Sequence, residues 1–133
     1  MTSHVPSLEW CKRLKACGFP QKTKFWYKRW VHNYGDPREY KPGDEYIFKL
    51  DYGDRGNTKD FEVYAAPIAT ELMEELPDWG ENRSIYVFCD CGTYFVQYRE
   101  WGFGKVIADF NDDYLCNALS AMYEHLAKGG LLK

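Results

Sequence analysis

The stretch best suited to binding chemistry is a basic and aromatic segment, Lys24–Tyr34. Its residues alternate with the two-residue period of an extended strand. Bases of single-stranded nucleic acid stack on exposed aromatic rings while Lys and Arg contact phosphates. The segment therefore predicts a binding site formed by Trp26, Lys28, Arg29, Trp30 and His32. Two alternatives stay open: a central strand with a buried aromatic face and overlying Lys and Arg stems, and a protein-docking surface.

Cysteine chemistry is the second candidate. In Cys89-Asp90-Cys91 a strand spacing places the two thiols about 7 Å apart on one face. Structural zinc sites usually take paired ligands from turns with two to four intervening residues. Free cysteines more often behave as small buried hydrophobic residues. We therefore expect reduced thiols and no metal site among the five cysteines.

Catalytic arrangements are equally weak. Cys116 and His125 lie nine residues apart on one predicted helix, about two and a half turns, which is too far for contact. The other two histidines are His4 and His32. Gly102-Phe103-Gly104-Lys105 lacks the longer glycine frame and Ser/Thr of a phosphate loop and predicts a hairpin turn. We expect no catalytic residues, no cofactor and no enzymatic activity.

The elements that must position these residues follow from hydrophobic periodicity. Helices are predicted over Leu8–Ala16, over Ile68–Leu76 with Leu72, Met73 and Leu76 inward, and over a final segment with Leu115, Leu119, Met122 and Leu126 inward. Strands are predicted over Lys24–Tyr34, Glu45–Tyr52, Phe61–Ala65, Ser84–Cys91, Thr93–Trp101 and around Val106–Phe110.

This order, α-β-β-β-α-β-β-β-α, predicts one α+β domain over residues 1–133, with residues 1–6 as a loose tail. The preferred arrangement is a single antiparallel sheet of about six strands covered by the helices. Two three-stranded half-sheets that face each other, with helices outside, are the alternative.

Charge is unevenly distributed along the chain. Residues 1–50 contain ten Lys and Arg against five Asp and Glu, whereas residues 51–133 contain seven against fifteen. Pairing within the fold is the favoured explanation, because a sequence pI near 5.6 argues against a dedicated nucleic-acid binder. The chain has no signal-like apolar region and no membrane-spanning run, so we expect a soluble cytoplasmic protein without membrane contact.

Several short motifs resemble a family of small phage and prophage proteins without established activity. These are Gly18-Phe19-Pro20 after the first helix, the aromatic strand Phe25-Trp26-Tyr27, Ala66-Pro67 followed by Glu71-Leu72, and the amphipathic helix Ala118–Leu132. Ile68 departs from the capping Thr that such proteins commonly carry. The resemblance implies a phage-encoded accessory protein in the bacterial cytoplasm.

Three classes of function therefore remain. The favoured one is a non-catalytic interaction protein that docks on a host or phage protein through an aromatic patch, interferes with a host system, or self-associates as a homodimer. The second is a single-stranded nucleic-acid binder that uses the strand over residues 24–32. The third is a small enzyme of unrecognised type, which a deep cleft with convergent polar groups would indicate.

Overall fold

The computed structural model describes residues 4–30, 49–52, 61–77, 79–80, 83–100 and 104–132. These form an α+β fold. Its elements are α1 (Leu8–Ala16), β1 (Phe25–Trp30), β2 (Lys49–Tyr52), β3 (Phe61–Ala65), α2 (Ala69–Glu75), β4 (Trp79–Gly80), β5 (Arg83–Asp90), β6 (Thr93–Glu100), β7 (Val106–Asp112) and α3 (Leu115–Lys128).

The strands form two antiparallel sheets, so the preference for a single sheet was wrong. The first sheet has the order β2-β1-β3 and the second has the order β4-β5-β6-β7. The short β4, which the sequence did not predict, pairs with the start of β5 through Trp79 and Gly80. Helix α2 lies between β3 and β4 in the sequence, so it connects the last strand of the first sheet to the first strand of the second.

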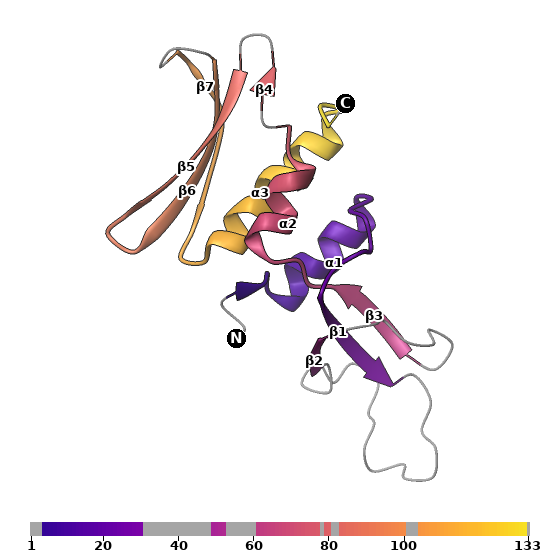
Figure 1. The fold of residues 1–133 in the computed structure, drawn as a ribbon. Coiled ribbons are helices and arrows are strands. Elements are labelled where there is room, and N and C mark those ends of the chain that lie inside the picture. Colours follow the sequence, from indigo (N-terminus) through magenta and orange to yellow (C-terminus); the bar gives the residue numbers. More distant parts are fainter. Residues whose placement is uncertain are drawn as a thin grey trace.

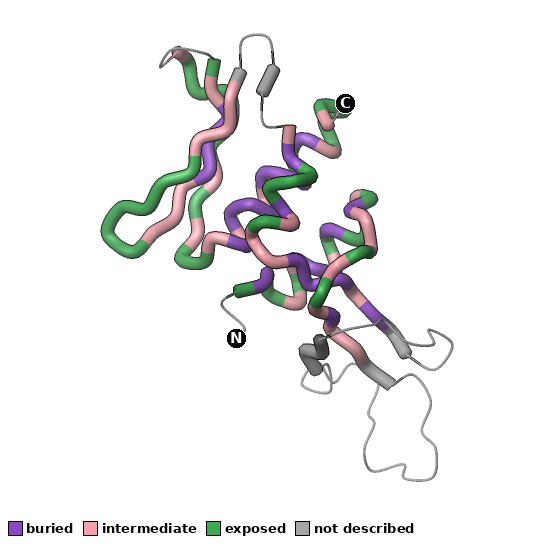
Figure 2. Tube along the Cα trace, viewed as in Figure 1, coloured by how far each residue is buried: buried purple, intermediate pink, exposed green. Residues whose placement is uncertain are grey.

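The helices occupy the space between the two sheets rather than their outer faces (Figure 1). Helix α3 packs on β6 and β7, while α1 packs on both α3 and β3. The main core joins all three helices to the four-stranded sheet, through residues that include Leu14, Leu72, Val96, Leu119 and Met122. In Figure 2 the buried segments accordingly concentrate along α3 and the parts of the chain that face it.

Helix α1 begins where the sequence predicts. The Ser7 hydroxyl accepts a hydrogen bond from the Trp10 backbone N–H at 3.3 Å, and Cys11 and Leu14 form the buried side of the helix. The Ser7 backbone N–H donates to Asn117 Oδ1 of α3 at 2.9 Å. The start of α1 is thus fixed both by its own cap and by the last helix.

Replacing Ser7 by alanine removes this cap acceptor. We expect the free energy of unfolding to fall by about 1 kcal/mol, the usual cost of losing a serine cap. Equilibrium urea unfolding followed by circular dichroism measures the difference. Ser7→Asp serves as the control, because aspartate also caps helices and should keep stability close to the wild type; equal losses in both variants would contradict the capping role.

The expectation of a loose tail was wrong for residues 4–6. Val5 is 2% exposed and Pro6 is fully buried. The carbonyl oxygen of His4 accepts from Cys116 Sγ at 3.2 Å, and that of Pro6 accepts from the Tyr27 hydroxyl at 3.3 Å. The segment before α1 therefore joins β1 to α3.

Helices α2 and α3 present most of the predicted apolar positions to the core. Leu72, Leu119, Met122 and Leu126 have no exposed surface. Met73 is the exception, because it is 45% exposed on the outer side of α2. The N-cap residue of α3 is Tyr114, which makes no side-chain cap bond, and its backbone N–H donates to Asp112 Oδ1 at 2.9 Å; the helix ends at Gly129.

The β5–β6 hairpin turns through Cys91 and Gly92, since Asp90 pairs directly with Thr93. Both turn residues have positive φ, 52° for Cys91 and 82° for Gly92. Two-residue hairpins prefer such backbone angles because they match the twist of the strands. Glycine adopts them readily, whereas cysteine adopts them at a cost.

No helix in the described part of the chain is long and apolar enough to span a membrane.

Candidate functional site

The basic and aromatic segment lies on β1, which is the central strand of the first sheet. Trp26 is only 4% exposed and clusters with Val63 and Ala65 of β3, so the expectation that its indole is exposed for stacking was wrong. Lys28 is half-buried. Arg29 and Trp30 belong to the strand, but their side chains, and all of His32, lie outside the described residues.

The opposite face of β1 packs toward α1. Phe25, Tyr27 and Tyr64 are packed against a cluster of buried residues formed by Val5, Cys11 and Ala66. The aromatic residues on both faces of this strand therefore contribute to packing in the described structure. This arrangement agrees with the central-strand interpretation more closely than with an exposed stacking surface.

Part of the charge asymmetry is compensated inside the fold. Arg13 of α1 forms a two-bonded ion pair with Glu124 of α3. Lys15 donates to the Val63 carbonyl oxygen at 3.0 Å, and its ammonium lies 5.1 Å from the centre of the Tyr64 ring. Two cations of the first half, Arg13 and Lys15, thus contact the second half, and one of them, Arg13, pairs with a carboxylate there.

An aromatic surface lies on the four-stranded sheet, on the face directed away from α3. The strand register puts Tyr86 and Phe88 of β5 opposite Gln97 and Phe95 of β6 on this face. In Figure 1 the three helices all lie on the other side of this sheet. We call this face the outer sheet surface, defined by Tyr86, Phe88, Phe95, Gln97, Arg99 and Ile107.

Phe88 and Phe95 form the centre of the outer sheet surface. Their rings are stacked with centroids 5.0 Å apart and an interplanar angle of 10°. Phe88 nevertheless stays 41% exposed, although it is a large apolar side chain. An exposed apolar side chain that its neighbour already holds in place can be buried by a partner at a small cost in conformational entropy.

Arg99 is held beside this pair by two contacts. Its Nε donates to Gln97 Oε1 at 2.7 Å, and its guanidinium lies 5.2 Å from the centre of the Tyr86 ring. Gln97 is itself 8% exposed, so the contact is well packed. The two terminal nitrogens of Arg99 still have donors available for a carboxylate, because the Nε contact uses only one of the five N–H groups.

The free edge of the sheet is irregular. Arg99 pairs with Val106 and Tyr98 pairs with Ala108, so β7 carries an extra residue, Ile107, at this point. Val106 and Ile107 are 40% and 38% exposed. A bulge on an edge strand increases twist and disfavours the addition of a further strand, so the exposed face of the sheet is better suited to contact than the β7 edge.

Four of the five cysteines fall into two groups, and the fifth, Cys17, is half-buried, with a pKa that burial raises. Burial raises the pKa of the Cys116 thiol to about 11 and raises the pKa of Cys11 further. Cys89 and Cys91 are exposed at the hairpin, so the expectation of small buried cysteines was wrong for this pair. The hairpin extends beyond the helices (Figure 2), and no core therefore covers it.

We expect the thiol reagent DTNB to distinguish these groups at neutral pH. Cys89 and Cys91 should react rapidly, whereas Cys11 and Cys116 should react only as fast as the protein opens, because the thiolate is the reactive form. A Cys89→Ser, Cys91→Ser variant should lose the rapid phase. Rapid labelling of Cys11 in the folded protein would contradict this assignment.

Sequence reasoning did not single out the outer sheet surface. The signal was present in the alternation of β5 and β6, which places Tyr86 and Phe88, and then Phe95, on the face opposite the core. Aromatic residues on the solvent-facing side of a strand indicate a partner-binding surface more specifically than the aromatic content of the whole chain does.

Among the described residues, no group of three or more His, Cys, Asp or Glu is placed to hold a metal ion. Comparison with known proteins finds no matching family model, no matching curated protein and no matching solved structure.

Proposed function

We propose that the protein is a non-catalytic interaction module whose docking surface is the outer sheet surface. The observation that carries the proposal is the stacked Phe88–Phe95 pair, of which Phe88 is exposed and Phe95 is half-buried, on a sheet face that no described helix covers. Aromatic residues and Arg are enriched at the centres of protein interfaces, where they contribute most of the binding energy.

The size of the surface is consistent with this role. Eight residues of β5 and β6 extend for about 26 Å, and three strands span roughly 14 Å, which gives a footprint on the order of 400 Å². A footprint of this kind favours a transient complex rather than an obligate one.

The chemistry of the surface also describes its partner. Phe88 and Phe95 fit an apolar side chain of the partner, and Arg99 fits a carboxylate of the partner near that side chain. From the resemblance to phage proteins we further propose that the partner is a host or phage protein in the bacterial cytoplasm and that binding interferes with a host system. The acidic residues Asp90 and Asp109 lie on the same strands, and they disfavour a nucleic-acid backbone.

A quantitative affinity capture tests the proposal. Tagged wild-type protein is compared with Phe88→Ser and with Met73→Ser, a matched control that removes another large exposed apolar side chain, on α2. We expect a discrete protein to bind the wild type and Met73→Ser, and its affinity for Phe88→Ser to be at least about tenfold lower. Purified partner and calorimetry then give the dissociation constants.

Nuclease treatment separates the alternatives. A partner that survives nuclease and depends on Phe88 supports protein docking through the outer sheet surface. Capture that disappears with nuclease would instead support the nucleic-acid class, and its dependence on salt would then be measured. Equal capture by wild type and Phe88→Ser would contradict the proposed surface.

A further inference from the structure

The sheet face that carries the outer sheet surface has opposite charges at its two ends. Strand β6 presents Thr93, Phe95, Gln97 and Arg99 on this face in that order, and Asp90 of β5 pairs directly with Thr93 at the hairpin end. Six residues of an extended strand span about 20 Å, so Arg99 and Asp90 of one copy lie too far apart to form an ion pair. Asp90 is exposed and has no ion-pair partner among the described residues.

This order of charges makes the face complementary to itself. A two-fold axis between two facing sheets, perpendicular to the strands and midway between Phe95 and Gln97, places Arg99 of one copy over Thr93 of the other. Neighbouring strands lie about 5 Å apart, so the guanidinium reaches the carboxylate of Asp90 beside that threonine. The contact forms twice, because a two-fold interface is isologous. Facing sheets keep their strands within about 30° of each other, which preserves this order of rows.

The side chains near the axis fit the same arrangement. Phe88 and Tyr86 of β5 lie in the two rows beside the axis, so the Phe88 ring of one copy meets the Tyr86 ring of the other. Asn111 and Asp109 of β7 lie in the same two rows, and the Asn111 amide can donate to the Asp109 carboxylate of the second copy. The arrangement buries the exposed Phe88 ring and places no two like charges opposite each other.

The charges exclude the alternative two-fold arrangement of the same faces. An axis parallel to the strands keeps each residue of β6 opposite its own copy. Arg99 would then face Arg99, and two guanidinium groups in contact repel each other. Of the two arrangements, the antiparallel one alone brings Arg99 to a carboxylate.

The area of the face limits the strength of this contact. The face offers on the order of 400 Å² per copy, about half of what a stable interface buries on each partner. Its centre consists of aromatic rings, which contribute most where an interface excludes water. We therefore expect a weak dimer that forms and separates readily.

We propose that a second copy of this chain covers the outer sheet surface in this antiparallel dimer, and that the dimer regulates docking by competing with the partner for the same surface. The inference rests on the proposed function, because one surface serves both contacts. Copies at high local concentration cover each other's Phe88, whereas dilute copies present it to the partner. The exposed ring is thereby protected until a partner of higher affinity is present.

Sedimentation equilibrium of the full-length protein measures the association. A reducing agent keeps the exposed Cys89 and Cys91 from forming disulfides between copies. We expect monomer at about 5 µM, an increasing share of dimer up to about 1 mM, and a dissociation constant on the order of 100 µM.

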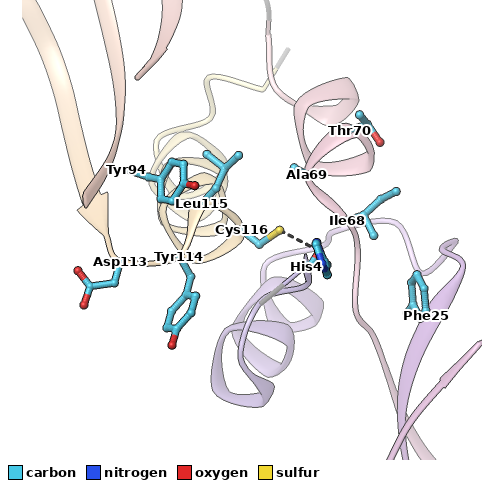
Figure 3. Close-up of a pocket in the computed structure, with 10 residues that line it drawn as sticks. All are labelled: His4, Phe25, Ile68, Ala69, Thr70, Tyr94, Asp113, Tyr114, Leu115 and Cys116. Carbon is cyan, nitrogen blue, oxygen red and sulfur yellow. Dashed lines mark hydrogen bonds between the residues drawn. The ribbon is translucent and has the colours of Figure 1, made fainter. Parts of the chain in front are cut away.

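The opposite side of the sheet provides an internal control, because the dimer leaves it uncovered. Tyr94 of β6 lies on that side, where it lines a cavity of about 670 Å³ together with Leu115 and Cys116 of α3 (Figure 3). Two-dimensional NMR of ¹⁵N-labelled protein over a dilution series locates the interface. We expect the amides of Phe88 and Phe95 to shift with concentration, and those of Leu115 and Cys116 to stay in place.

Charge reversals test the antiparallel arrangement. Asp90→Arg places like charges opposite each other at both ends of the interface and should weaken the dimer at least about tenfold. Arg99→Glu should weaken it similarly, and the double variant should recover most of the affinity, because the ion pair forms again with its signs exchanged. Glu74→Arg makes the same change of charge on the exposed side of α2 and should leave the dimer unchanged. The NMR spectrum of each variant verifies its fold.

Several results would overturn the inference. These are a protein that stays monomeric at every concentration, dilution shifts at Leu115 and Cys116 in place of Phe88, and equal dimer affinities of the wild type and Asp90→Arg.

The dimer and the proposed function can fail separately. Asp90→Arg keeps Phe88, Phe95 and Arg99, so this monomeric variant should capture the partner at least as well as the wild type does. Weaker capture by Asp90→Arg would contradict the competition between dimer and partner. Phe88-dependent capture by a protein that is always monomeric would contradict the dimer alone, whereas a dimer that captures no partner would contradict the docking function alone.

Discussion

Replacing Leu119 by alanine is expected to lower the free energy of unfolding by about 3 kcal/mol. Leu119 lies in the middle of α3 with no exposed surface, within the cluster that includes Leu14 of α1, Leu72 of α2 and Val96 of β6. The substitution removes three carbon atoms where every neighbouring element is already packed, so the site can collapse only partly. Chemical denaturation measures the change.

A control and a second measurement make this result specific. Leu131→Ala removes the same atoms from a residue that is 40% exposed and should cost less than about 0.5 kcal/mol. Hydrogen exchange of Leu119→Ala should show protection falling together in both sheets, because α3 contacts the four-stranded sheet directly and the three-stranded sheet through α1. Loss of protection in one sheet alone would contradict a shared core.

The second large effect is expected at the ion pair between α1 and α3. Arg13 Nε donates to Glu124 Oε2 at 2.9 Å, and a second guanidinium nitrogen donates to Oε1. The Glu124 side chain is 11% exposed, whereas that of Arg13 is 45% exposed and lies over the Trp10 ring. Glu124→Gln keeps the shape but removes the charge, and we expect it to cost about 2 kcal/mol at pH 7.

The pH dependence of this difference follows from the sign of the shift. The hydrogen bonds from Arg13 lower the pKa of Glu124 below its ordinary value of 4.5. The folded protein therefore favours the carboxylate, and the stabilisation is complete above the unfolded pKa and lost as pH falls through the folded one. The stabilities of wild type and Glu124→Gln should converge in that acidic window.

Urea unfolding at a series of pH values from 7 downward measures this convergence. Glu74→Gln, which removes a carboxylate from the exposed side of α2, is the control and should follow the wild type at every pH. A gap between wild type and Glu124→Gln that stays constant through the acidic window would show that the charge of Glu124 is not the source of the stabilisation.

The helices were the most predictable part of this fold. Helix α1 has the predicted bounds, because the capping residue Ser7 and the spacing of Cys11 and Leu14 are local signals. The number of sheets was not predictable in the same way. The alternation of residues along a strand indicates which side chains share a face of the sheet. It does not indicate whether β3 pairs with a strand beyond α2, because that pairing depends on contacts between distant segments.

The errors in predicted side-chain burial also arise from contacts between distant segments. Met73 and Leu72 are adjacent on α2, and only the position of α3 decides that Leu72 is buried while Met73 is exposed. An exposed Trp26 was required by the nucleic-acid interpretation of its strand, and a buried aromatic face was the alternative left open. The packing against Val63 and Ala65 that buries it involves β3, which lies more than thirty residues away in the chain.

The candidate site was only partly predictable from sequence. The alternation is consistent with Phe88 and Phe95 on the face opposite the core, but the sequence interpretation assigned its aromatic docking surface to the segment Lys24–Tyr34. The stacking of Phe88 and Phe95, and the position of Arg99 over Tyr86, depend on the register between β5 and β6. Short strands of similar pattern can pair in more than one register, so this contact required the structure.

The central position of α3 has a consequence for the order in which the protein is made. On the ribosome, α1 and the three-stranded sheet emerge well before α3, although α1 needs Glu124 and Asn117 of α3 for its charge pair and for the Ser7 contact. Domains usually fold from the N-terminus during synthesis. Here the early half has to wait, with its apolar faces uncovered, until the last described helix has been translated.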